Sequence, residues 1–424
     1  MELINLPYGK DRVSVTIPKH NFIGMMDPEF AVPCADPEKS IEAAILNPIG
    51  GAKLKDIITS EKTISIIIDD ISRPTPISTI LPILLSHLLS LGAVRENIVI
   101  VAALGSHRYM TEEELKKRVG DEIYENYRVI NSEFRKPEGL TYVGKTPEGV
   151  DILVTKAVMD TDIHIGIGCL VPHPTMGWAG GGKIIYPGVA GEKVVAYFHL
   201  LSSLYEGCFY GMDTTPIRDM MEKWVDSVGL HFIVNVLLNE NAEIVDVVAG
   251  HYVKAHREGV RRGKQIVGYK LTEKADIMIA SSHPADQDFW QSTKALQAAE
   301  IAVKGDRGGI MILLSPNFEG IGPNPDYPKW IGKDDCDEIV RECILGKSVD
   351  DPLALAVGNS ISKLRRRRRV IVVSDGVSAE EMKQCGCEHY RVSEFQHLID
   401  KLISENPNCR IAAISNGAKT LLYE

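Results

Sequence analysis

Short apolar runs rich in β-branched residues alternate with amphipathic stretches along this chain. The runs span residues 63–69, 97–104, 162–168, 231–238, 275–281, 309–315, 370–375 and 411–415. Helix-like stretches such as ISTILPILLSHLLSLG (77–92) and TEEELKKRVGDEIYENY (111–127) lie between several of them. Near-continuous apolar strands joined by helical crossovers are typical of parallel sheets that are covered on both faces. The alternation therefore predicts an α/β fold with largely parallel sheets.

The length of 424 residues exceeds what one hydrophobic core normally supports, so two α/β domains are expected. Residues 251–276 are polar and helix-like without a strand pattern, which predicts a helical connector. We expect an N-terminal domain over residues 1–265 and a C-terminal domain over residues 266–424. The C-terminal domain is expected to close over a site in the cleft between the domains.

Composition excludes several classes of protein. A net charge of −10 gives little support to nucleic-acid binding through phosphate neutralisation. No apolar run approaches the ~20 residues of a membrane span, and the N-terminus lacks the apolar core of a signal peptide. The cysteines are scattered without a CxxC pair, which argues against a Cys₄ zinc site and favours a reducing cytoplasm. Cys385-Gly-Cys387 is a weak metal motif, and Arg365–Arg369 is interpreted as a solvated segment.

Polar clusters follow four of the predicted strands. They are Asp70-Ile71-Ser72-Arg73, Gly105-Ser106-His107-Arg108, the segment CLVPHPTMGWAGGGK (169–183), and Ser282-His283-Pro284-Ala285-Asp286. Open α/β sheets bind ligands at the carboxyl ends of their strands. The clusters therefore predict one shared site.

Each candidate side chain has a structural alternative. Arg73 is either an ion-pair partner of Asp69 or Asp70, or a clamp for a substrate carboxylate. His107 either caps the helix that follows it or acts as a general base. His173 has the same two interpretations, and the functional one is favoured because the glycine-rich segment follows directly.

Three further histidines are weighed in the same way. His164 alternates with isoleucines inside a predicted strand and is interpreted as a sheet residue. His283 is interpreted as a helix-entry residue or a site residue. His199 lies on a predicted helix with no histidine four residues away, so a two-histidine zinc helix is excluded. If His199 binds a metal, most of the other ligands come from elsewhere.

The segment HPTMGWAGGGKIIYPGVAG (173–191) resembles a phosphate loop. Gly177, Gly182 and Lys183 have the P-loop spacing, but Ile184 replaces the hydroxyl residue that would hold magnesium. Backbone N–H groups at the entry to a helix suit an anion such as a phosphate. Lys183 is then either a phosphate partner or a nucleophile.

The spacing of His173, Lys183 and His199 around GWAGGGK resembles the signature of the lactate racemase family. The motifs DDISRPTP with Arg73, GSHR with His107, and WQSTK (290–294) agree with this family in order. The resemblance extends from residue 60 to beyond residue 300.

The resemblance implies a nickel-pincer nucleotide, a nicotinate-derived mononucleotide that carries two sulfur groups and Ni(II). It implies that Lys183 holds this cofactor covalently and that His199 supplies the fourth nickel ligand, which suits square-planar Ni(II). The other residues expected to bind the cofactor are Asp70, Gly177, Trp178, Gly180, Gly181 and Gly182. Asp70 is expected to hold the ribose or to support Arg73.

The resemblance also implies the reaction, which is racemisation or epimerisation of a 2-hydroxy acid through a 2-keto acid. His107 and His173 would serve as proton acceptors for the two enantiomers. Arg73 would bind the carboxylate, with help from Gln291 and Lys294 of the second domain. Cofactor-biosynthesis enzymes are implied partners.

The chain departs from the family's lactate enzyme in its tryptophans. That enzyme has a pocket tryptophan in the middle of its second domain, whereas the corresponding stretch here, DDPLALAVGNS (350–360), has none. Trp290 stands where that enzyme has a tyrosine. Relatives act on malate, aromatic acids and sugar acids, so the side chain of the substrate stays open. The competing hypotheses are a P-loop phosphotransferase and a non-catalytic carrier of the nickel nucleotide.

Overall fold

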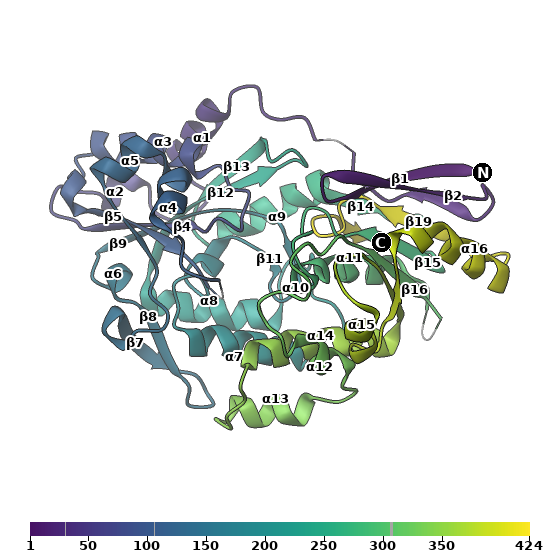
Figure 1. The fold of residues 1–424 in the computed structure, drawn as a ribbon. Helices are drawn as coiled ribbons and strands as arrows, with labels where there is room; N and C mark the ends of the chain where they lie inside the picture. Colours follow the sequence, from purple (N-terminus) through teal and green to yellow (C-terminus); the bar gives the residue numbers. More distant parts are fainter. Residues whose placement is uncertain (30, 106, 306–307) are drawn as a thin grey trace. The chain divides into compact units, whose positions relative to one another are not determined.

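The structure is a computed structural model that describes residues 1–29, 31–105, 107–305 and 308–424 (Figure 1). The chain divides into two compact units. Unit 1 contains Met1–Glu29, His199–Gly211 and Val267–Glu424. Unit 2 contains Phe30–Phe198 and Met212–Ile266.

Unit 2 is built on a six-stranded sheet with the order β13-β12-β9-β4-β5-β6. All neighbours in this sheet are parallel except β12 and β13, which are antiparallel. The strands are β4 (Ile64–Asp69), β5 (Ile98–Ala103), β6 (Arg128–Asn131), β9 (Ile163–Cys169), β12 (Leu230–Leu238) and β13 (Ile244–Gly250). The predicted α/β fold with largely parallel sheets is confirmed, and the apolar runs up to residue 238 form four of these strands.

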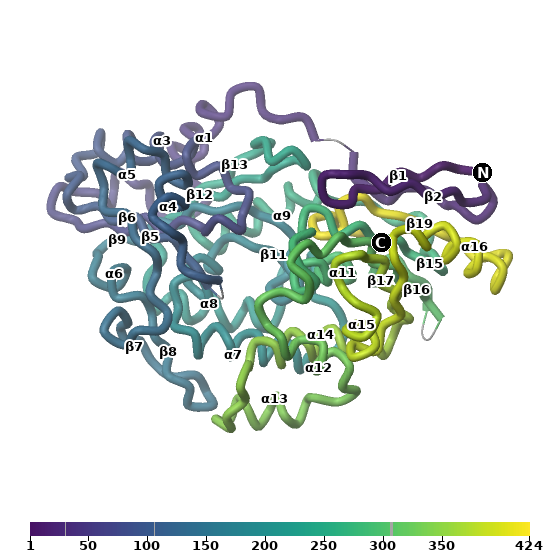
Figure 2. The backbone as a smooth tube through the Cα atoms, in the orientation of Figure 1, coloured from purple at the N-terminus to yellow at the C-terminus, as the bar shows by residue number. Residues whose placement is uncertain are grey.

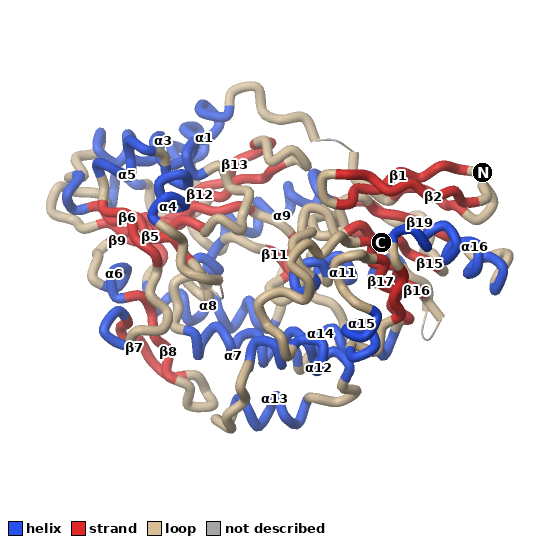
Figure 3. The backbone as a smooth tube through the Cα atoms, viewed as in Figure 1, coloured by secondary structure: helices blue, strands red, loops and turns tan. Residues whose placement is uncertain are grey.

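Helices cover both faces of this sheet (Figure 3). The helices of unit 2 are α1 (Pro37–Leu46), α2 (Leu54–Ile57), α3 (Ile77–Ser90), α4 (Glu112–Val119), α5 (Asp121–Asn126), α6 (Lys156–Met159), α8 (Pro216–Val228) and α9 (Lys254–Val267), together with the start of α7 (Glu192–Ser203). Short antiparallel pairs are formed by β7 (Leu140–Lys145) with β8 (Asp151–Thr155) and by β10 (Pro172–His173) with β11 (Gly177–Trp178).

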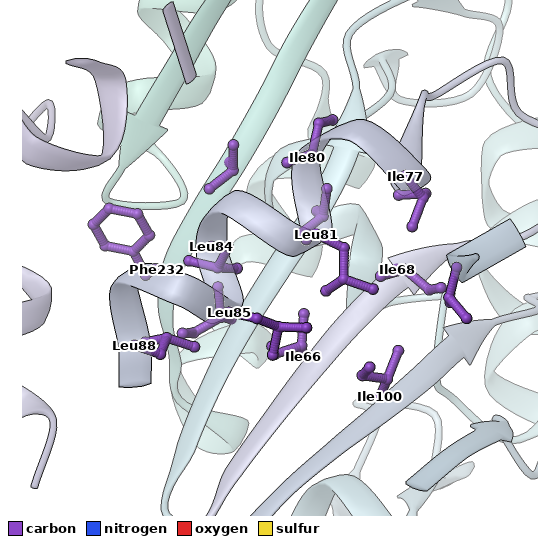
Figure 4. Close-up of a cluster of buried hydrophobic side chains, with 14 of the residues drawn as sticks. Ile66, Ile68, Ile77, Ile80, Leu81, Leu84, Leu85, Leu88, Ile100 and Phe232 are labelled. Carbon is purple, nitrogen blue, oxygen red and sulfur yellow. The ribbon is translucent and has the colours of Figure 1, made fainter. Parts of the chain in front are cut away.

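The core of unit 2 lies between the sheet and helix α3 (Figure 4). Apolar residues of α3 recur at the spacing of one helical face, namely Ile77, Ile80, Leu81, Leu84, Leu85 and Leu88. All of them are buried against alternate residues of the strands, such as Ile66, Ile68 and Ile100. On β9, isoleucines point into this core while Gly166 and Gly168 occupy alternate positions on the opposite face.

Unit 1 contains a second six-stranded sheet, with the order β18-β17-β16-β15-β19-β3 and parallel pairing throughout. Its strands are β3 (Phe22–Met25), β15 (Ile277–Ser281), β16 (Ile310–Leu314), β17 (Arg369–Val373), β18 (Glu388–Tyr390) and β19 (Ile411–Ile414). The helices are α10 (Phe289–Ser292), α11 (Lys294–Ala302), α12 (Tyr327–Gly332), α13 (Asp337–Ile344), α14 (Pro352–Arg367), α15 (Ala379–Gln384) and α16 (Phe395–Glu405). The remaining apolar runs of the sequence therefore form strands here.

Unit 1 is discontinuous in sequence, unlike the predicted ranges 1–265 and 266–424. The hairpin of β1 (Glu2–Tyr8) and β2 (Asp11–Ile17) packs into its core, and β3 pairs with β19 at the other end of the chain (Figure 2). Residues 199–211 join unit 1 because Asn359 and Lys363 of α14 donate hydrogen bonds to the carbonyls of Ser203 and Leu204, both at 3.1 Å. Tertiary pairing of this kind leaves no local signal.

Two local predictions are corrected. The predicted connector contains a strand, β14 (Gly268–Lys270), which pairs in parallel with β20 (Leu421–Tyr423) and is too short for a periodic signal. The arginine run is not simply solvated. Arg365 pairs with Asp334, Arg367 with Glu300, and Arg369 with Glu388, and all three arginines are partly buried.

Among the described residues, no helix is both long and apolar enough to cross a membrane. The cysteines of the described chain are free, and Cys385 and Cys387 are buried.

The packing of α3 makes a testable prediction. Leu84→Ala removes a side chain with 0% exposure and should lower the free energy of unfolding by about 2–5 kcal/mol in urea denaturation. Leu89→Ala, on the half-buried side of the same helix, is the matched control and should cost about 1 kcal/mol. Equal losses for the two variants would contradict the packing of α3.

Candidate functional site

The candidate site lies at one edge of the unit 2 sheet. Strand β4 pairs in parallel with β5 on one side and with β9 on the other, so the loops after the three strands leave from the same edge. The chain passes from β4 to β5 and β6 on one side, then returns to β9 on the other. The carboxyl ends of β4 and β9 therefore form a topological switch point, where open α/β sheets bind ligands.

Asp70 and His107 meet across the loops after β4 and β5. Asp70 Oδ2 lies 2.5 Å from His107 Nδ1, and Ser72 Oγ donates to Asp70 Oδ1 at 2.6 Å. Burial raises the pKa of Asp70, but the hydrogen bonds from His107 and Ser72 and the nearby charges outweigh it and lower this pKa to about 2. A carboxylate that stays ionised accepts a hydrogen bond from Nδ1–H, which leaves the lone pair of neutral His107 on Nε2.

The loop after β4 is held by Arg118 of α4. Its guanidinium pairs with the Asp69 side chain and donates to the Asp69 and Arg73 carbonyls, both at 3.1 Å. The ion pair with Asp69 that the sequence suggested for Arg73 is thus made by Arg118 instead. Among the described residues, no carboxylate lies within ion-pair distance of the half-buried Arg73.

The structural alternative for His107 is wrong, because Thr111 caps helix α4 in a capping box with Glu114. Ser106 of the predicted GSHR cluster lies outside the described residues. Gly105 N donates to Gly188 O at 2.9 Å, which joins the His107 loop to the glycine-rich segment. The loops after β4, β5 and β9 are therefore linked by hydrogen bonds within unit 2.

The glycine-rich segment packs closely into the fold. After β11 it forms a short 3₁₀ turn, η3 (Gly181–Ile184), and Gly177, Gly180 and Gly181 have φ between 61° and 75°. A Cβ at Gly180 would lie 2.8 Å from Asn235 Oδ1, and one at Gly181 would lie 2.8 Å from His256 Cδ2. These glycines are required by neighbouring protein atoms, whereas the sequence interpretation assigned them to close approach of a ligand.

Lys183 and Ile184 end this turn, and both are half-buried. A Cβ built on Gly166 of β9 would lie 2.8 Å from Ile184 Cγ2, so Ile184 packs on the sheet. Gly181 N donates to Asn235 Oδ1 at 2.9 Å. Among the described residues, the Gly180 and Gly182 amides have no hydrogen-bond acceptor. Two such N–H groups beside a lysine are a donor set that suits an anion.

His173 stands at the start of the segment, on β10. Its Nδ1 accepts from the amides of Thr175 at 3.2 Å and Met176 at 3.3 Å. Neutral His173 therefore carries its proton on Nε2, the opposite tautomer from His107. To take a second proton, His173 has to open these two contacts, because a protonated Nδ1 cannot accept from an N–H group.

His199 is half-buried on α7, at the first residue of the helix that belongs to unit 1. Within the described residues, no group of three or more His, Cys, Asp or Glu side chains could hold a metal ion.

The residues predicted from the second domain lie on α10 and α11 of unit 1. Lys294 donates to the Gln291 side chain, and Trp290 packs on Tyr327 with 4.7 Å between ring centroids. His283 lies 2.9 Å from Asp286. His164 is buried in β9 as predicted, with its ring nitrogens 2.9 and 3.0 Å from the carbonyl oxygens of Gly229 and Thr161.

Sequence reasoning missed four side chains that shape this region. Arg118, Asn235, Arg218 and His256 hold the loop after β4 or the glycine-rich segment. Arg118 and Arg218 are part of ordinary amphipathic helix patterns, and His256 lies in the stretch taken as a connector. Only Asn235, a polar residue inside an apolar strand run, carried a signal that could have been read.

Comparison with known proteins identifies the family. A model of the lactate racemase N-terminal domain matches residues 8–207, and a model of the C-terminal domain matches residues 271–422. The chain is 29% identical over 434 residues to the lactate racemase of Thermoanaerobacterium thermosaccharolyticum, with 100% of both chains covered. It is 28% identical to the lactate racemase of Lactiplantibacillus plantarum, with 90% of each covered.

Solved structures agree. The lactate racemase apoprotein from Thermoanaerobacterium thermosaccharolyticum matches with a TM-score of 0.87, 27% identity and complete coverage of both chains. A protein from Thermotoga maritima, at 20% identity and a TM-score of 0.69, shares the fold over 91% of this chain and 98% of its own. The resemblance inferred from the sequence motifs is confirmed. This chain belongs to the lactate racemase family and is an isomerase.

Proposed function

We propose that this protein inverts C2 of a lactate-like 2-hydroxy acid through a 2-keto acid intermediate, with a nickel-pincer nucleotide as cofactor. The observation that carries the proposal is the 2.5 Å contact between Asp70 and His107, next to the segment that bears Lys183. It supplies an oriented proton acceptor beside an anion-binding donor set. The names of the relatives support lactate as the reference substrate.

The residues present fit the proposed cofactor. The Gly180 and Gly182 amides suit its phosphate, and Lys183 is proposed as the covalent anchor through a thioamide, in which its Nζ carries no charge. His199 is proposed as the nickel ligand from the protein, which agrees with the lack of a preformed metal cluster in the described chain. When bound, this group would accept the C2 hydride of the substrate and return it. Contacts of Asp70, Gly177, Trp178 and Gly181 with the cofactor stay predictions.

His107 is proposed to take the hydroxyl proton of one enantiomer at Nε2. Asp70 keeps Nδ1 protonated and stabilises the imidazolium that forms, because it stays anionic beside the ring. Asp70 therefore acts mainly through His107 in this proposal.

His173 is proposed as the proton acceptor for the other enantiomer. That role requires its Nδ1 to release the amides of Thr175 and Met176. These two contacts are 3.2 and 3.3 Å long. Arg73 is proposed to bind the substrate carboxylate, which agrees with its lack of an ion pair in the described chain. The help predicted from Gln291 and Lys294 stays a prediction.

The competing functions fit less well. A phosphotransferase needs a hydroxyl ligand for magnesium after the lysine, whereas Ile184 packs on the sheet at this position. A carrier of the nickel nucleotide has no use for an ionised carboxylate that orients a histidine. The implied partners are the enzymes that make the cofactor.

The proposal predicts a cofactor adduct and two essential histidines. Expression together with the cofactor-making enzymes should give a mass adduct on Lys183 and about one nickel per chain by intact-protein mass spectrometry and metal analysis. His107→Ala and His173→Ala should keep this loading but lower racemisation about 10²–10⁴-fold in a chiral assay over a panel of 2-hydroxy acids.

His397→Ala is the matched control, because His397 is exposed on α16 and should leave turnover unchanged. Normal turnover of both His107→Ala and His173→Ala would contradict the proposed mechanism. Magnesium–ATP hydrolysis that survives nickel chelation would instead favour the phosphotransferase.

Replacing Asp70 separates its effect on His107 from cofactor binding. Asp70→Asn should lower kcat about 100-fold or more with nickel content unchanged, because an amide cannot stabilise the imidazolium as a carboxylate does. With a pKa of about 2, Asp70 stays ionised as the pH falls to 4, so an acid loss of wild-type activity between pH 7 and 4 is not due to Asp70. If the variant instead loses nickel at unchanged kcat per loaded site, Asp70 binds the cofactor.

A further inference from the structure

Behind the glycine-rich segment lies an arginine that is completely buried. Arg218, near the start of α8, has 0% exposure. Its Nε donates to Met176 O at 2.9 Å, and its Nη2 donates to Trp178 O. One guanidinium therefore holds two carbonyls of the segment that precedes Lys183.

His256 of α9 holds the next carbonyl. Its Nε2 lies 2.9 Å from Ala179 O, and its Nδ1 lies 2.9 Å from Arg257 Nη1. Arginine can only donate, so Nδ1 is the acceptor and Nε2–H donates to Ala179. Burial and the charges of Arg218 and Arg257 hold the pKa of His256 well below its usual range, which agrees with this neutral form.

The two helices are joined by one carboxylate. Glu222 accepts from Arg218 at 3.3 Å and from Arg257 at 3.0 and 2.7 Å. Two guanidinium cations thus share one buried carboxylate, and burial lowers the pKa of Arg218 only to about 10. The cluster keeps a net positive charge at neutral pH.

The contacts fix the direction in which the peptide groups of the segment point. The carbonyls of Met176, Trp178 and Ala179 bond to Arg218 and His256, so they are turned into the protein. The Gly180 and Gly182 amides have no acceptor among the described residues.

We propose that Arg218 and His256 are positioning residues for phosphate binding: they turn the carbonyls of Met176, Trp178 and Ala179 inward and leave the Gly180 and Gly182 amides for the phosphate of a mononucleotide. Arg218 also adds positive charge behind the anion. This inference deepens the proposed function and rests on its assignment of the segment to the cofactor phosphate.

The test measures binding to the cofactor-free chain. Inorganic phosphate and nicotinic acid mononucleotide are the probes, titrated by calorimetry at fixed salt concentration. Arg218→Gln loses the charge and should weaken both probes about tenfold or more. Arg218→Lys keeps the charge but loses the several N–H donors of the guanidinium. Its affinity for both probes should therefore lie between those of Arg218→Gln and the wild type.

The histidine pair tests geometry without a change of charge. His256→Gln can still donate to Ala179 O and should bind both probes within about threefold of the wild type. His256→Leu cannot donate and should weaken them about tenfold. Hydrogen–deuterium exchange of residues 176–184 without any probe should be faster in His256→Leu and Arg218→Gln, and close to wild type in His256→Gln.

A buried ion pair elsewhere controls for loss of stability. Lys363 of unit 1 is 2% exposed and pairs with Asp337, so Lys363→Met should destabilise the chain but leave binding and exchange in residues 176–184 unchanged. If the wild type binds the probes and the Arg218 and His256 variants bind as well, the inference is overturned and the proposed function stands. If the wild type binds neither probe, the phosphate assignment fails, and the inference fails with it.

Discussion

The parallel pairing of β4 with both β5 and β9 is the constraint on which the rest of the site depends. It brings the Asp70 loop, the His107 loop and the glycine-rich segment to one edge of the sheet, although about 110 residues separate Asp70 from Lys183. The isoleucines of β4 and β9 fix this pairing by packing under α3. Gly166 of β9 has no side chain on the opposite face, which leaves room for Ile184 to pack there. The same strands therefore pack the core on one face and, on the other face and at their carboxyl ends, support the segments of the site.

Two features of the fold could be predicted from the sequence, whereas the partners of individual side chains could not. The apolar runs predicted the strands because burial on both faces demands them, and polar residues at their ends predicted which loops meet. The partner of each side chain was not predictable. Asp69 pairs with Arg118 of α4 and Asp70 with His107 of the loop after β5, and no local pattern in the sequence distinguishes the two partners. The entry of the first 29 residues into unit 1 depends on the pairing of β3 with β19, which has no local signature.

Charge is used in opposite ways on the two sides of the glycine-rich segment. Toward the loops after β4 and β5, the anionic Asp70 lies 2.5 Å from the His107 ring. On the side of α8 and α9, burial and the charges of Arg218 and Arg257 hold the pKa of His256 well below its usual range, which keeps its ring neutral. The proton exchange proposed for His107 would use the first environment, and the carbonyl contact of His256 uses the second. The contrast separates His107 from His256 by physical criteria alone.

The glycine-rich segment shows how a motif can be recognised correctly for an incomplete reason. Its likeness to a phosphate loop suggested that the glycines admit a ligand, but a Cβ at Gly180 would clash with Leu170 and Asn235, and one at Gly181 with His256. The glycines let the backbone reach protein donors and an acceptor, and this contact orients the peptide groups. Anion binding, where it occurs, is then a consequence of peptide orientation set from behind. Ile184 helps to fix this orientation, because its side chain packs on the sheet and holds the turn in place. A hydroxyl side chain that bound magnesium at this position would instead have to face solvent.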